Sequence, residues 1–374
     1  MSFATGEDVM GVVEGVIRNL WTKLKGDDDV PAGAFRRMTY KEAMSRYGSD
    51  KPDTRFGMEI SRVEHLLPAD LISKITPLED PIVEAFKLEN EEGDPLAMFQ
   101  FITQFLDSPK GAAFNNNPDG GPGVFVFDAK KPLCGLHAFG FEGADAIGQT
   151  LDIDQGDLII LQARQRVPTF SGGSTRIGDL RRDLHSSAVA AGLKPIPQQK
   201  KGTDFLWIVD FPLFSPSTTE DPGQDGAAGI SSTHHPFTAP KSSTDIDLLR
   251  TDPTKCIADH YDLVVNGVEL GGGSRRIHDV RVQEFIFRDI LQMSARRLDD
   301  FSHLLDALRC GCPPHAGFAL GFDRLIAVML GRESIREVIA FPKTGKGGED
   351  VMVGAPSLMS DEALAMYHLE LRLE

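Results

Sequence analysis

The chain has 374 residues, of which 41% are hydrophobic and 25% are charged, and its formal net charge is -16. This length allows two domains with a large core, and the composition is ordinary for a globular protein. No run of about 18 uncharged apolar residues occurs, so no membrane-spanning helix is expected. The negative charge argues against a protein that holds nucleic acid by bulk electrostatics, so any contact with RNA must use local basic patches.

Residues 5–25 are predicted to form a helix that begins at a capping box. Thr5 and Asp8 have the spacing of that box, and apolar residues recur behind it at helical intervals. The glycine-, aspartate- and proline-rich string GDDDVPAG then ends the helix. A segment containing RMTYKEAMSRYGSDKPDTR completes the first predicted part of the chain, residues 1–55. The apolar side chains expected to face the core are Val9, Val12, Val13, Val16, Ile17, Leu20 and Leu24.

Residues 56–202 are predicted to form an inserted α+β domain. Short apolar runs at 123–127 and 158–161 alternate there with turn sequences such as NNNPDGGPG. No constellation of catalytic side chains stands out in this segment.

The last predicted part of the chain, residues 203–374, is richer in strands. Residues 205–211 (FLWIVDF) and 261–270 (YDLVVNGVEL) each indicate one buried strand. Residues 215–230 indicate a polar, glycine-rich loop. Helices are expected at 283–300 and 322–331.

The four cysteines are expected to be reduced thiols. Cys310 and Cys312 are close in sequence, but Cys134 and Cys256 are far from them. One C-x-C pair without a second pair is a poor zinc site.

The string ELGGGSRR, residues 269–276, is the first candidate for chemistry. Consecutive glycines let a ligand approach the backbone closely, between the carboxylate of Glu269 and the guanidinium of Arg276. Alternation along a single strand would put Asp262 and Glu269 on opposite faces, unless the strand is bulged or bent. Taken alone, the string also fits a solvated hairpin.

Two further strings carry candidate residues. In THHPFT, residues 233–238, the adjacent His234 and His235 point opposite ways on an extended chain and make a poor metal pair, so an exposed turn is the simpler interpretation. In GCPPHAGFALGFDR, residues 311–324, a turn precedes a strand and then a helix. The free amides of that helix start and Arg324 suit a phosphate, although Arg324 could instead pair with a structural carboxylate.

In this order the three strings resemble class II aminoacyl-tRNA synthetases, in particular the aspartyl enzymes of bacterial and mitochondrial type. GCPPHAGFALGFDR resembles motif 3 of that class, and YDLVVNGVELGGGSRRIH resembles the strand with its metal-linked acid. HHPFTAP resembles the histidine loop, and RYGSDKPDTRFG the start of the insertion domain. IREVIAFPKT near the end of the chain fits as well. The resemblance is close at both ends of the chain and loose over residues 56–202.

The resemblance implies an α+β fold: part of the antiparallel-sheet catalytic core of the class, carrying an inserted α+β domain. It also implies an aspartate–tRNA ligase, which makes aspartyl-adenylate from L-aspartate and ATP and then charges tRNA-Asp. The implied residue roles are these: Arg276 binds the substrate's side-chain carboxylate; His234, with His235 beside it, contacts the aspartate; Glu269 holds ATP through Mg²⁺, helped by Asp262; and Arg324, with Gly321, Phe322 and Asp323, holds the other end of ATP. Leucine is usual in the family at the position of Phe322, a change that leaves the chemistry alone.

Some family features are absent from this sequence. It shows no motif 1, no motif 2 arginine and no anticodon-binding barrel, so the resemblance is to a C-terminal catalytic portion. We expect such a portion to be inactive alone in aspartate activation. A truncated chain, a partner of a separately encoded front half and a degenerate paralogue are the three explanations, and the first is favoured because the site residues are retained.

Partners and location follow only from the resemblance. The full-length family implies a homodimer, and the loosely matched insertion suggests the mitochondrial matrix, with the bacterial cytoplasm as the alternative. Charging of tRNA-Asn as well stays open. The rival functions are an amide-forming enzyme on the same sheet and a non-catalytic paralogue that binds ATP or aspartate.

Overall fold

The computed structural model describes residues 1–26, 30–167, 169–196, 202–217, 226–342 and 359–371. It divides into two compact units, Met1–Ala319 and Leu320–Glu374. The predicted domain limits at residues 56 and 202 both fall inside the first unit. Among the described residues no helix has the length and apolar character needed to cross a membrane.

The main sheet of the first unit has five strands in the order β1-β6-β9-β10-β11. Its strands are β1 (Arg36–Thr39), β6 (Phe205–Val209), β9 (His260–Val265), β10 (Val268–Arg276) and β11 (His315–Leu320). The predicted antiparallel arrangement is confirmed for β6, β9 and β10, whereas β1 runs parallel to β6. A small second sheet pairs β7 (Phe214–Pro216) with β8 (Ile230–Ser232). Residues 218–225 of the predicted loop lie outside the described residues.

Helix α1 (Gly6–Leu24) confirms the predicted capping box, because Thr5 and Asp8 bond reciprocally. The buried face differs from the predicted one. Val12, Val16 and Leu24 are exposed, whereas the carboxylate of Glu14 is buried. The reason is a hydrogen bond across the core: the indole N–H of Trp207 donates to Glu14 at 3.0 Å.

The remaining helices of the main-sheet region come from the parts of the chain before and after the inserted segment. They are α2 (Tyr40–Arg46), α9 (Ser243–Thr251), η5 (Pro253–Lys255), α10 (Val280–Phe285), η6 (Ile286–Ile290), α11 (Ala295–Asp300) and α12 (Ser302–Arg309). The predicted helix at 283–300 is therefore wrong as one element. It passes through a π-helical turn, η6, and is then broken at Gln292, whose φ of 51° is left-handed, before α11 starts behind its cap Ser294.

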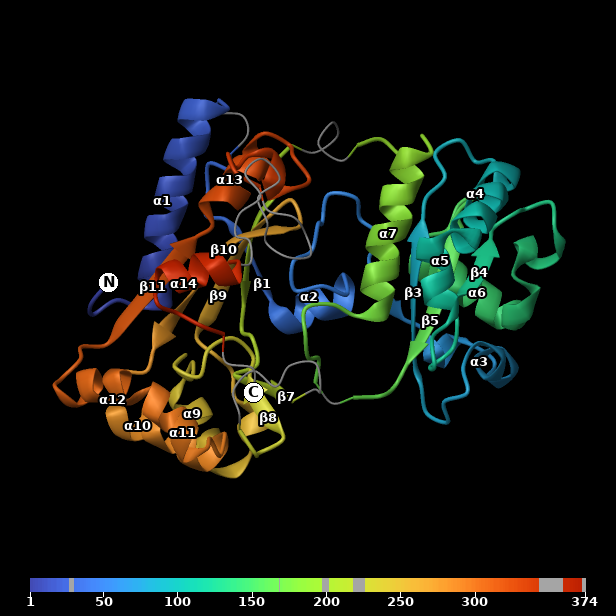
Figure 1. Cartoon of the computed structure of the whole chain (residues 1–374). Helices are drawn as coiled ribbons and strands as arrows, with labels where there is room; N and C mark the ends of the chain where they lie inside the picture. The colour runs from blue at the N-terminus through green and yellow to red at the C-terminus, as the bar shows by residue number, and fades with distance from the viewer. Residues whose placement is uncertain (27–29, 168, 197–201, 218–225, 343–358, 372–374) are drawn as a thin grey trace. The chain divides into compact units, whose positions relative to one another are not determined.

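Residues 61–190 build a separate four-stranded antiparallel sheet, in the order β2-β3-β5-β4 (Figure 1). Its strands are β2 (Ser61–Arg62), β3 (Ile82–Leu88), β4 (Gly123–Val126) and β5 (Leu158–Arg164). Its helices are η2 (Glu64–Leu66), α3 (Ala69–Ile75), α4 (Pro95–Asp107), α5 (Pro109–Asn115), η3 (Pro132–Gly135), η4 (His137–Phe139), α6 (Gly140–Leu151) and α7 (Arg176–Ala190). A hydrophobic cluster on each face of this sheet explains why β3 and β5 are apolar almost throughout. A sheet with cores of its own supports the proposed insertion domain.

Leu320–Glu374 forms the second unit, which is described by itself. It contains α13 (Phe322–Met329), η7 (Ile335–Glu337) and α14 (Asp361–Met366). The predicted helix at 322–331 is confirmed, with Gly321 at the cap position.

One arginine joins the inserted segment to the chain that enters it. Arg181 of α7 is 2% exposed, and its guanidinium donates to the carbonyl oxygens of Met58 at 2.8 Å, Asp53 at 3.0 Å and Gly57. The same group lies 4.2 Å from the ring centroid of Phe56. A single side chain therefore holds the crossing backbone against α7.

Arg181→Ala is expected to reduce the free energy of unfolding by about 3 kcal/mol, because three partly buried carbonyl groups lose their donor and the buried side chain leaves a cavity. Arg182→Ala is the matched control, since Arg182 is exposed on the same helix and pairs with Asp179 at its surface. It should cost about 0.5 kcal/mol at most. Urea unfolding followed by far-UV circular dichroism measures both. Equal stability of the two variants would contradict this account of the junction.

Candidate active site

The segment 261–270 is a hairpin, so its prediction as one strand is wrong. Strand β9 ends at Val265, and β10 begins at Val268 and runs back along it. The two residues between them, Asn266 and Gly267, have φ values of 55° and 79°. Positive φ at both central residues is what a two-residue type I′ turn requires, and Asn-Gly is the sequence that adopts it most readily.

A β-bulge in β10 decides which side chains share a face. Glu269 pairs with Val264, but the next paired residue, Gly271, lies opposite Leu263, so Leu270 has no partner on β9. Paired residues of antiparallel strands point to the same side of the sheet. Glu269 therefore faces the same side as Asp262, and beyond the bulge Arg276 returns to that side too. The bend that the sequence analysis left open is present.

The glycines of β10 make room for the protein's own groups. Gly272 lies opposite Asp262, and a Cβ on Gly272 would lie 2.4 Å from the Oδ1 atom of Asp262. A Cβ on Gly273 would lie 2.2 Å from the carbonyl oxygen of Gly317 on β11. The sequence alone predicts that this space admits a ligand. In the structure it admits a buried carboxylate and the neighbouring strand.

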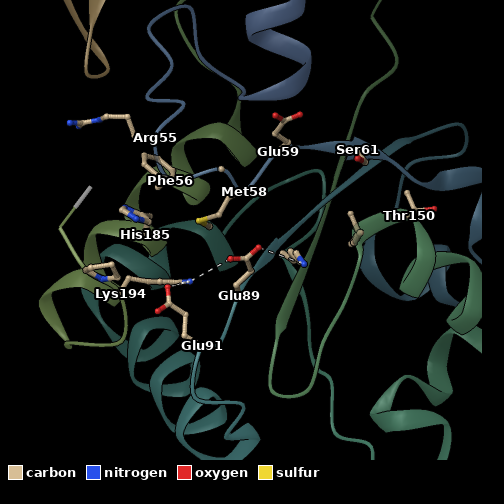
Figure 2. A pocket seen from close by; sticks show the side chains of 14 residues that line it. Arg55, Phe56, Met58, Glu59, Ser61, Glu89, Glu91, Thr150, His185 and Lys194 are labelled. Atoms are coloured by element: carbon tan, nitrogen blue, oxygen red, sulfur yellow. Dashed lines mark ion pairs between the residues drawn. The ribbon is translucent and has the colours of Figure 1, made fainter. Parts of the chain in front are cut away.

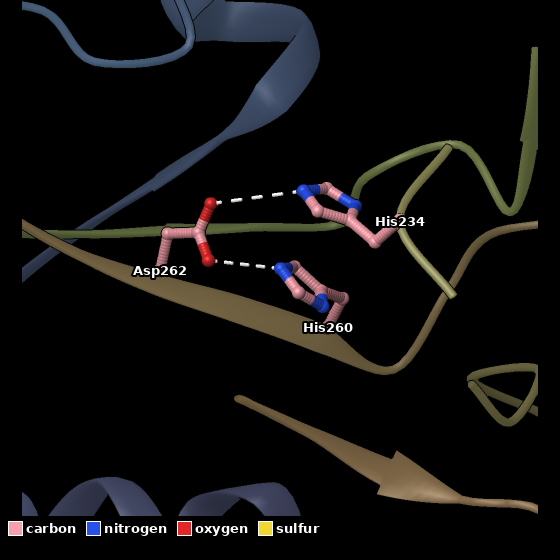
Figure 3. A group of neighbouring side chains, drawn as sticks. All are labelled: His234, His260 and Asp262. Atoms are coloured by element: carbon pink, nitrogen blue, oxygen red, sulfur yellow. Dashed lines mark hydrogen bonds and ion pairs between the residues drawn. The ribbon is translucent and has the colours of Figure 1, made fainter. Parts of the chain in front are cut away.

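The carboxylate of Asp262 faces the edges of two histidine rings that stack on each other (Figure 3). Its Oδ1 atom is 2.8 Å from Nε2 of His260, and its Oδ2 atom is 3.8 Å from Nε2 of His234. The two ring centroids are 3.7 Å apart. The sequence pointed to His234 and Asp262 but not to His260, which lies one residue before the strand predicted at 261–270.

Burial governs the charges of this cluster. It lowers the pKa of His234 and of His260 to about 3, so both imidazoles are neutral at pH 7. Burial also raises the pKa of Asp262. Among the described residues, these three form the only group of nitrogen and oxygen ligands close enough to bind one metal ion. The two rings are inclined by only 19° to each other, and the Nε2 atoms of both rings face the carboxylate of Asp262 (Figure 3).

Two further residues reach the site from the GSDKPD string, and the sequence analysis missed both. Lys51 Nζ lies 2.9 Å from Oδ2 of Asp50 and 3.5 Å from Oε2 of Glu269. The carboxylates of Asp50, Glu269 and Asp262 all act to raise the pKa of Lys51, although burial opposes them. One ammonium group thus stands among three carboxylates. The charged residues of the GSDKPD string indicated a possible site. Glu269 is more than 200 residues away along the chain, so the sequence did not show that Lys51 reaches it.

Arg276 offers an unused donor. Its guanidinium carbon lies 4.9 Å from the ring centroid of Phe237, and burial lowers the pKa of this half-buried group. The Nη1 atom is buried and has no hydrogen-bond partner in the structure. His235 is exposed and stacks on Phe237 with ring centroids 5.1 Å apart. The loop from His234 to Thr238 is fixed at its end by an antiparallel bridge from Thr238 to Arg276.

The predicted ATP-binding residues belong to the second unit. Gly321 precedes α13 and supplies no side-chain cap to its first amides. Phe322, Asp323 and Arg324 are exposed in the first turn of that helix. Free amides at a helix start favour an anion, so an ATP-binding role for this turn stays a prediction.

A pocket of about 440 Å³ lies apart from these residues, in the inserted segment (Figure 2). The stacked rings of Phe56 and His185 form part of its wall, and Lys194 pairs there with Glu89 at 3.8 Å and Glu91 at 3.7 Å. None of the predicted site residues lines it. Lys87 also pairs with Glu89 at 3.7 Å, whereas Arg55 and Glu59 pair with Asp53 and Arg46 outside the pocket lining.

Comparison with known proteins relates the chain to one family. The model of the class II tRNA synthetases (D, K and N) matches residues 1–345. A mitochondrial aspartate–tRNA ligase of Schizosaccharomyces pombe is 36% identical over 97% of this chain and 55% of its own length. The corresponding figures are 36%, 99% and 53% for the mitochondrial aspartate–tRNA ligase of Mus musculus, and 37%, 100% and 56% for the aspartate–tRNA(Asp/Asn) ligase of Salinibacter ruber. The chain thus spans about half the length of the curated relatives it matches.

Gly272→Ala is expected to lower the free energy of unfolding by about 1–3 kcal/mol, because the new methyl group collides with the Asp262 carboxylate. Gly317→Ala is the control from the neighbouring strand, since a Cβ there meets nothing within 4 Å. It should be nearly neutral. Urea unfolding distinguishes them, and a stable Gly272→Ala protein would refute the close approach of Gly272 to Asp262.

Because His234 and His260 are neutral when buried, the free energy of unfolding is expected to decrease as the pH is lowered. Between pH 6.5 and about 3 the unfolded chain takes up protons at His234 and His260 while the folded chain does not, so their contribution is complete above pH 6.5 and is lost as the pH falls. His260→Phe should reduce the stability lost between pH 6 and pH 5 by about 1 kcal/mol. Urea unfolding at the two pH values tests this. The exposed His303, changed to Phe, is the control, and equal losses in both variants would count against a buried neutral His260.

Proposed function

The chain belongs to the class II tRNA synthetases, and from that membership we propose that its site serves an aspartate–tRNA ligase. In this proposal L-aspartate reacts with ATP to give aspartyl-adenylate, and the aspartyl group then passes to tRNA. The observation that carries the choice of amino acid is Arg276, whose buried Nη1 atom has no hydrogen-bond partner in the structure. The names of the relatives support the same choice.

Arg276 selects the substrate by charge and shape. A guanidinium group presents parallel N–H donors that match a carboxylate in bidentate fashion. The side-chain carboxylate of aspartate would satisfy the unpaired nitrogen and neutralise a half-buried charge. Asparagine would offer one acceptor and a competing NH₂ group, so a donor would stay unpaired at considerable cost.

The three carboxylates around Lys51 would receive the cationic groups. Asp50 and Glu269 lie within 3.5 Å of Lys51 Nζ, so a cation is already accommodated there. The same acidic environment suits the ammonium group of the amino acid. It also suits Mg²⁺, which prefers oxygen ligands.

Magnesium fits the donors of the site. Glu269 is partly exposed and Asp262 is buried. Only Oδ1 of Asp262 is within hydrogen-bonding distance of an imidazole, which leaves Oδ2 available. These two residues would hold the ion, and the ion would neutralise phosphate charge.

Catalysis in this proposal needs orientation rather than a covalent intermediate. Arg276 and His234 would fix the amino acid so that its α-carboxylate oxygen faces the α-phosphorus of ATP. A neutral His234 can donate or accept one hydrogen bond without adding charge. Arg324, at the start of α13 in the second unit, would bind phosphate oxygens. Alignment of the reactants and preorganised donors are the main sources of rate in such a reaction.

The remaining partners belong to the proposal as well. We take tRNA-Asp as the acceptor, a homodimer as the assembly and the mitochondrial matrix as the location. Mitochondrial relatives support the location, although a bacterial relative is equally similar. With a net charge of -16, contact with tRNA would depend on local basic groups.

Binding of a non-hydrolysable adenylate tests the site in this chain. Calorimetry should show aspartyl-sulfamoyl-adenosine binding at least about tenfold more tightly than its asparaginyl counterpart, because only the former supplies a carboxylate to Arg276. Arg276→Lys should weaken the aspartyl compound by about 3 kcal/mol, or a factor of about 100, since lysine cannot form the bidentate pair.

Arg275→Lys is the matched control for that experiment. Arg275 is the adjacent residue, but it faces the other side of β10 and pairs with Asp259 at 2.6 Å. Its variant should keep the preference for the aspartyl compound. A chain that binds both compounds equally, or an Arg276→Lys variant with native affinity, would remove Arg276 from the proposed role. Aspartate-dependent ATP–pyrophosphate exchange by the whole protein then separates a ligase from a paralogue that only binds.

A further inference from the structure

His260 occupies a place that the proposed reaction does not explain. It lies two residues before Asp262 on β9, so both side chains point to the same face of the sheet. The residue is 7% exposed, and its Nε2 atom is 2.8 Å from Oδ1 of Asp262. Because a carboxylate oxygen is an acceptor, Nε2 carries the proton and donates it.

The same imidazole also supports His234. The two rings are 3.7 Å apart and inclined by only 19°, and the ring of Phe211 lies edge-on to both, at 4.8 Å from His234 and 5.1 Å from His260. His234 lies 3.8 Å from Asp262, which is too far for a hydrogen bond. The position of the His234 ring therefore depends on its aromatic contacts with His260 and Phe211.

The second ring nitrogen of His260, Nδ1, does not help to hold the ring in place. Its Nδ1 atom is buried and has no hydrogen-bond partner among the residues that the structure describes. Among the described residues, three contacts fix the orientation of this ring: the hydrogen bond to Asp262, the stack on His234 and the edge-on ring of Phe211. A buried nitrogen without a partner reduces the stability of the fold. This cost suggests that His260 is retained for a role in the site.

We propose that His260 is a positioning residue with two separable tasks: its Nε2–H group fixes the carboxylate of Asp262, and its ring is the support on which His234 stacks. The proposal rests on the function proposed for this site, in which Asp262 serves Mg²⁺-ATP and His234 serves aspartate. His260 itself touches neither substrate. Each task belongs to a different part of the imidazole, so each can be removed alone.

Two substitutions separate the tasks. His260→Phe keeps a flat aromatic ring of similar size and removes the donor to Asp262. His260→Gln keeps an N–H donor at the reach of Nε2 and removes the ring. The exposed His303 of α12, changed to Gln, is the control for the general effect of losing a histidine.

Ligand binding is the first measurement. In His260→Phe, calorimetry should show Mg²⁺-ATP bound about tenfold more weakly and aspartate bound within about twofold of the native chain, since one hydrogen bond to a charged group is lost. In His260→Gln the pattern should reverse. A purely structural role would weaken both ligands in both variants alike, and this result would overturn the proposal, as would native binding in both.

Nuclear magnetic resonance of the ligand-free chain is the second measurement, and it does not depend on the proposed function. Long-range ¹H–¹⁵N spectra should show His260 as the Nε2–H tautomer. The ring protons of His234 should keep their ring-current shift in His260→Phe and lose it in His260→Gln. An Nδ1–H tautomer, or a His234 signal that is unchanged in both variants, would overturn the positioning role.

The two measurements also separate the two hypotheses. If the native chain binds neither aspartate nor Mg²⁺-ATP while the spectra behave as expected, the proposed function fails and the positioning by His260 stands. If the native chain binds both ligands and the variants show no reciprocal pattern, the positioning role fails and the proposed function stands.

Discussion

A single unpaired residue in β10 determines which side chains of the site can meet. Positions 269 and 276 have opposite parity, so a regular strand would send their side chains to opposite faces. Leu270 breaks that alternation, because it has no partner on β9. Glu269 and Arg276 therefore both face the side that carries Asp262. A carboxylate and a guanidinium can address one small molecule only because the backbone is irregular between them.

The site then accumulates features that are unfavourable for folding. It buries a carboxylate, keeps two imidazoles uncharged and leaves one guanidinium nitrogen without a partner. Lys51 compensates part of the negative charge, and Gly272 yields the space that Asp262 needs. Ligand groups of the right sign would satisfy what the protein leaves unpaired. Local rules of folding are typically broken in this way where a protein binds its ligand.

The sequence predicted correctly those features that depend on residues close together in the chain. The capping box of α1 and the buried strands at 205–209 and 158–164 follow from short-range spacing, and the structure has them. The candidate residues His234 and Asp262 also came from local strings. They do lie together, although their roles stay proposals.

Other features depend on contacts that no window of sequence contains. The sequence 261–270 was predicted as one strand because its apolar residues continue on both sides of the turn. The pair Asn266–Gly267 is typical of a two-residue hairpin turn and could have indicated it. Glu14 is buried because Trp207 needs an acceptor, which a helical period cannot show. Asp50 and Lys51 reach Glu269 only through the folded sheet. His260 lies just outside the strand predicted at 261–270, and its partners are visible only in the folded structure, where the loop that carries His234 packs against it.

The turn at Asn266–Gly267, which joins β9 to β10, is also a site where the protein can be damaged chemically over time. Asn followed by Gly is the pair most prone to deamidation, because the glycine nitrogen can attack the asparagine side chain and form a succinimide. Here the side-chain oxygen of Asn266 accepts a hydrogen bond from the backbone of Asp204 at 2.9 Å, which holds the amide in place. Opening of the hairpin would release it, and the isoaspartate that follows would add a methylene group to the main chain. The register of β10 would then be lost by ageing rather than by mutation, and the slow step of that loss would be the local unfolding of one turn.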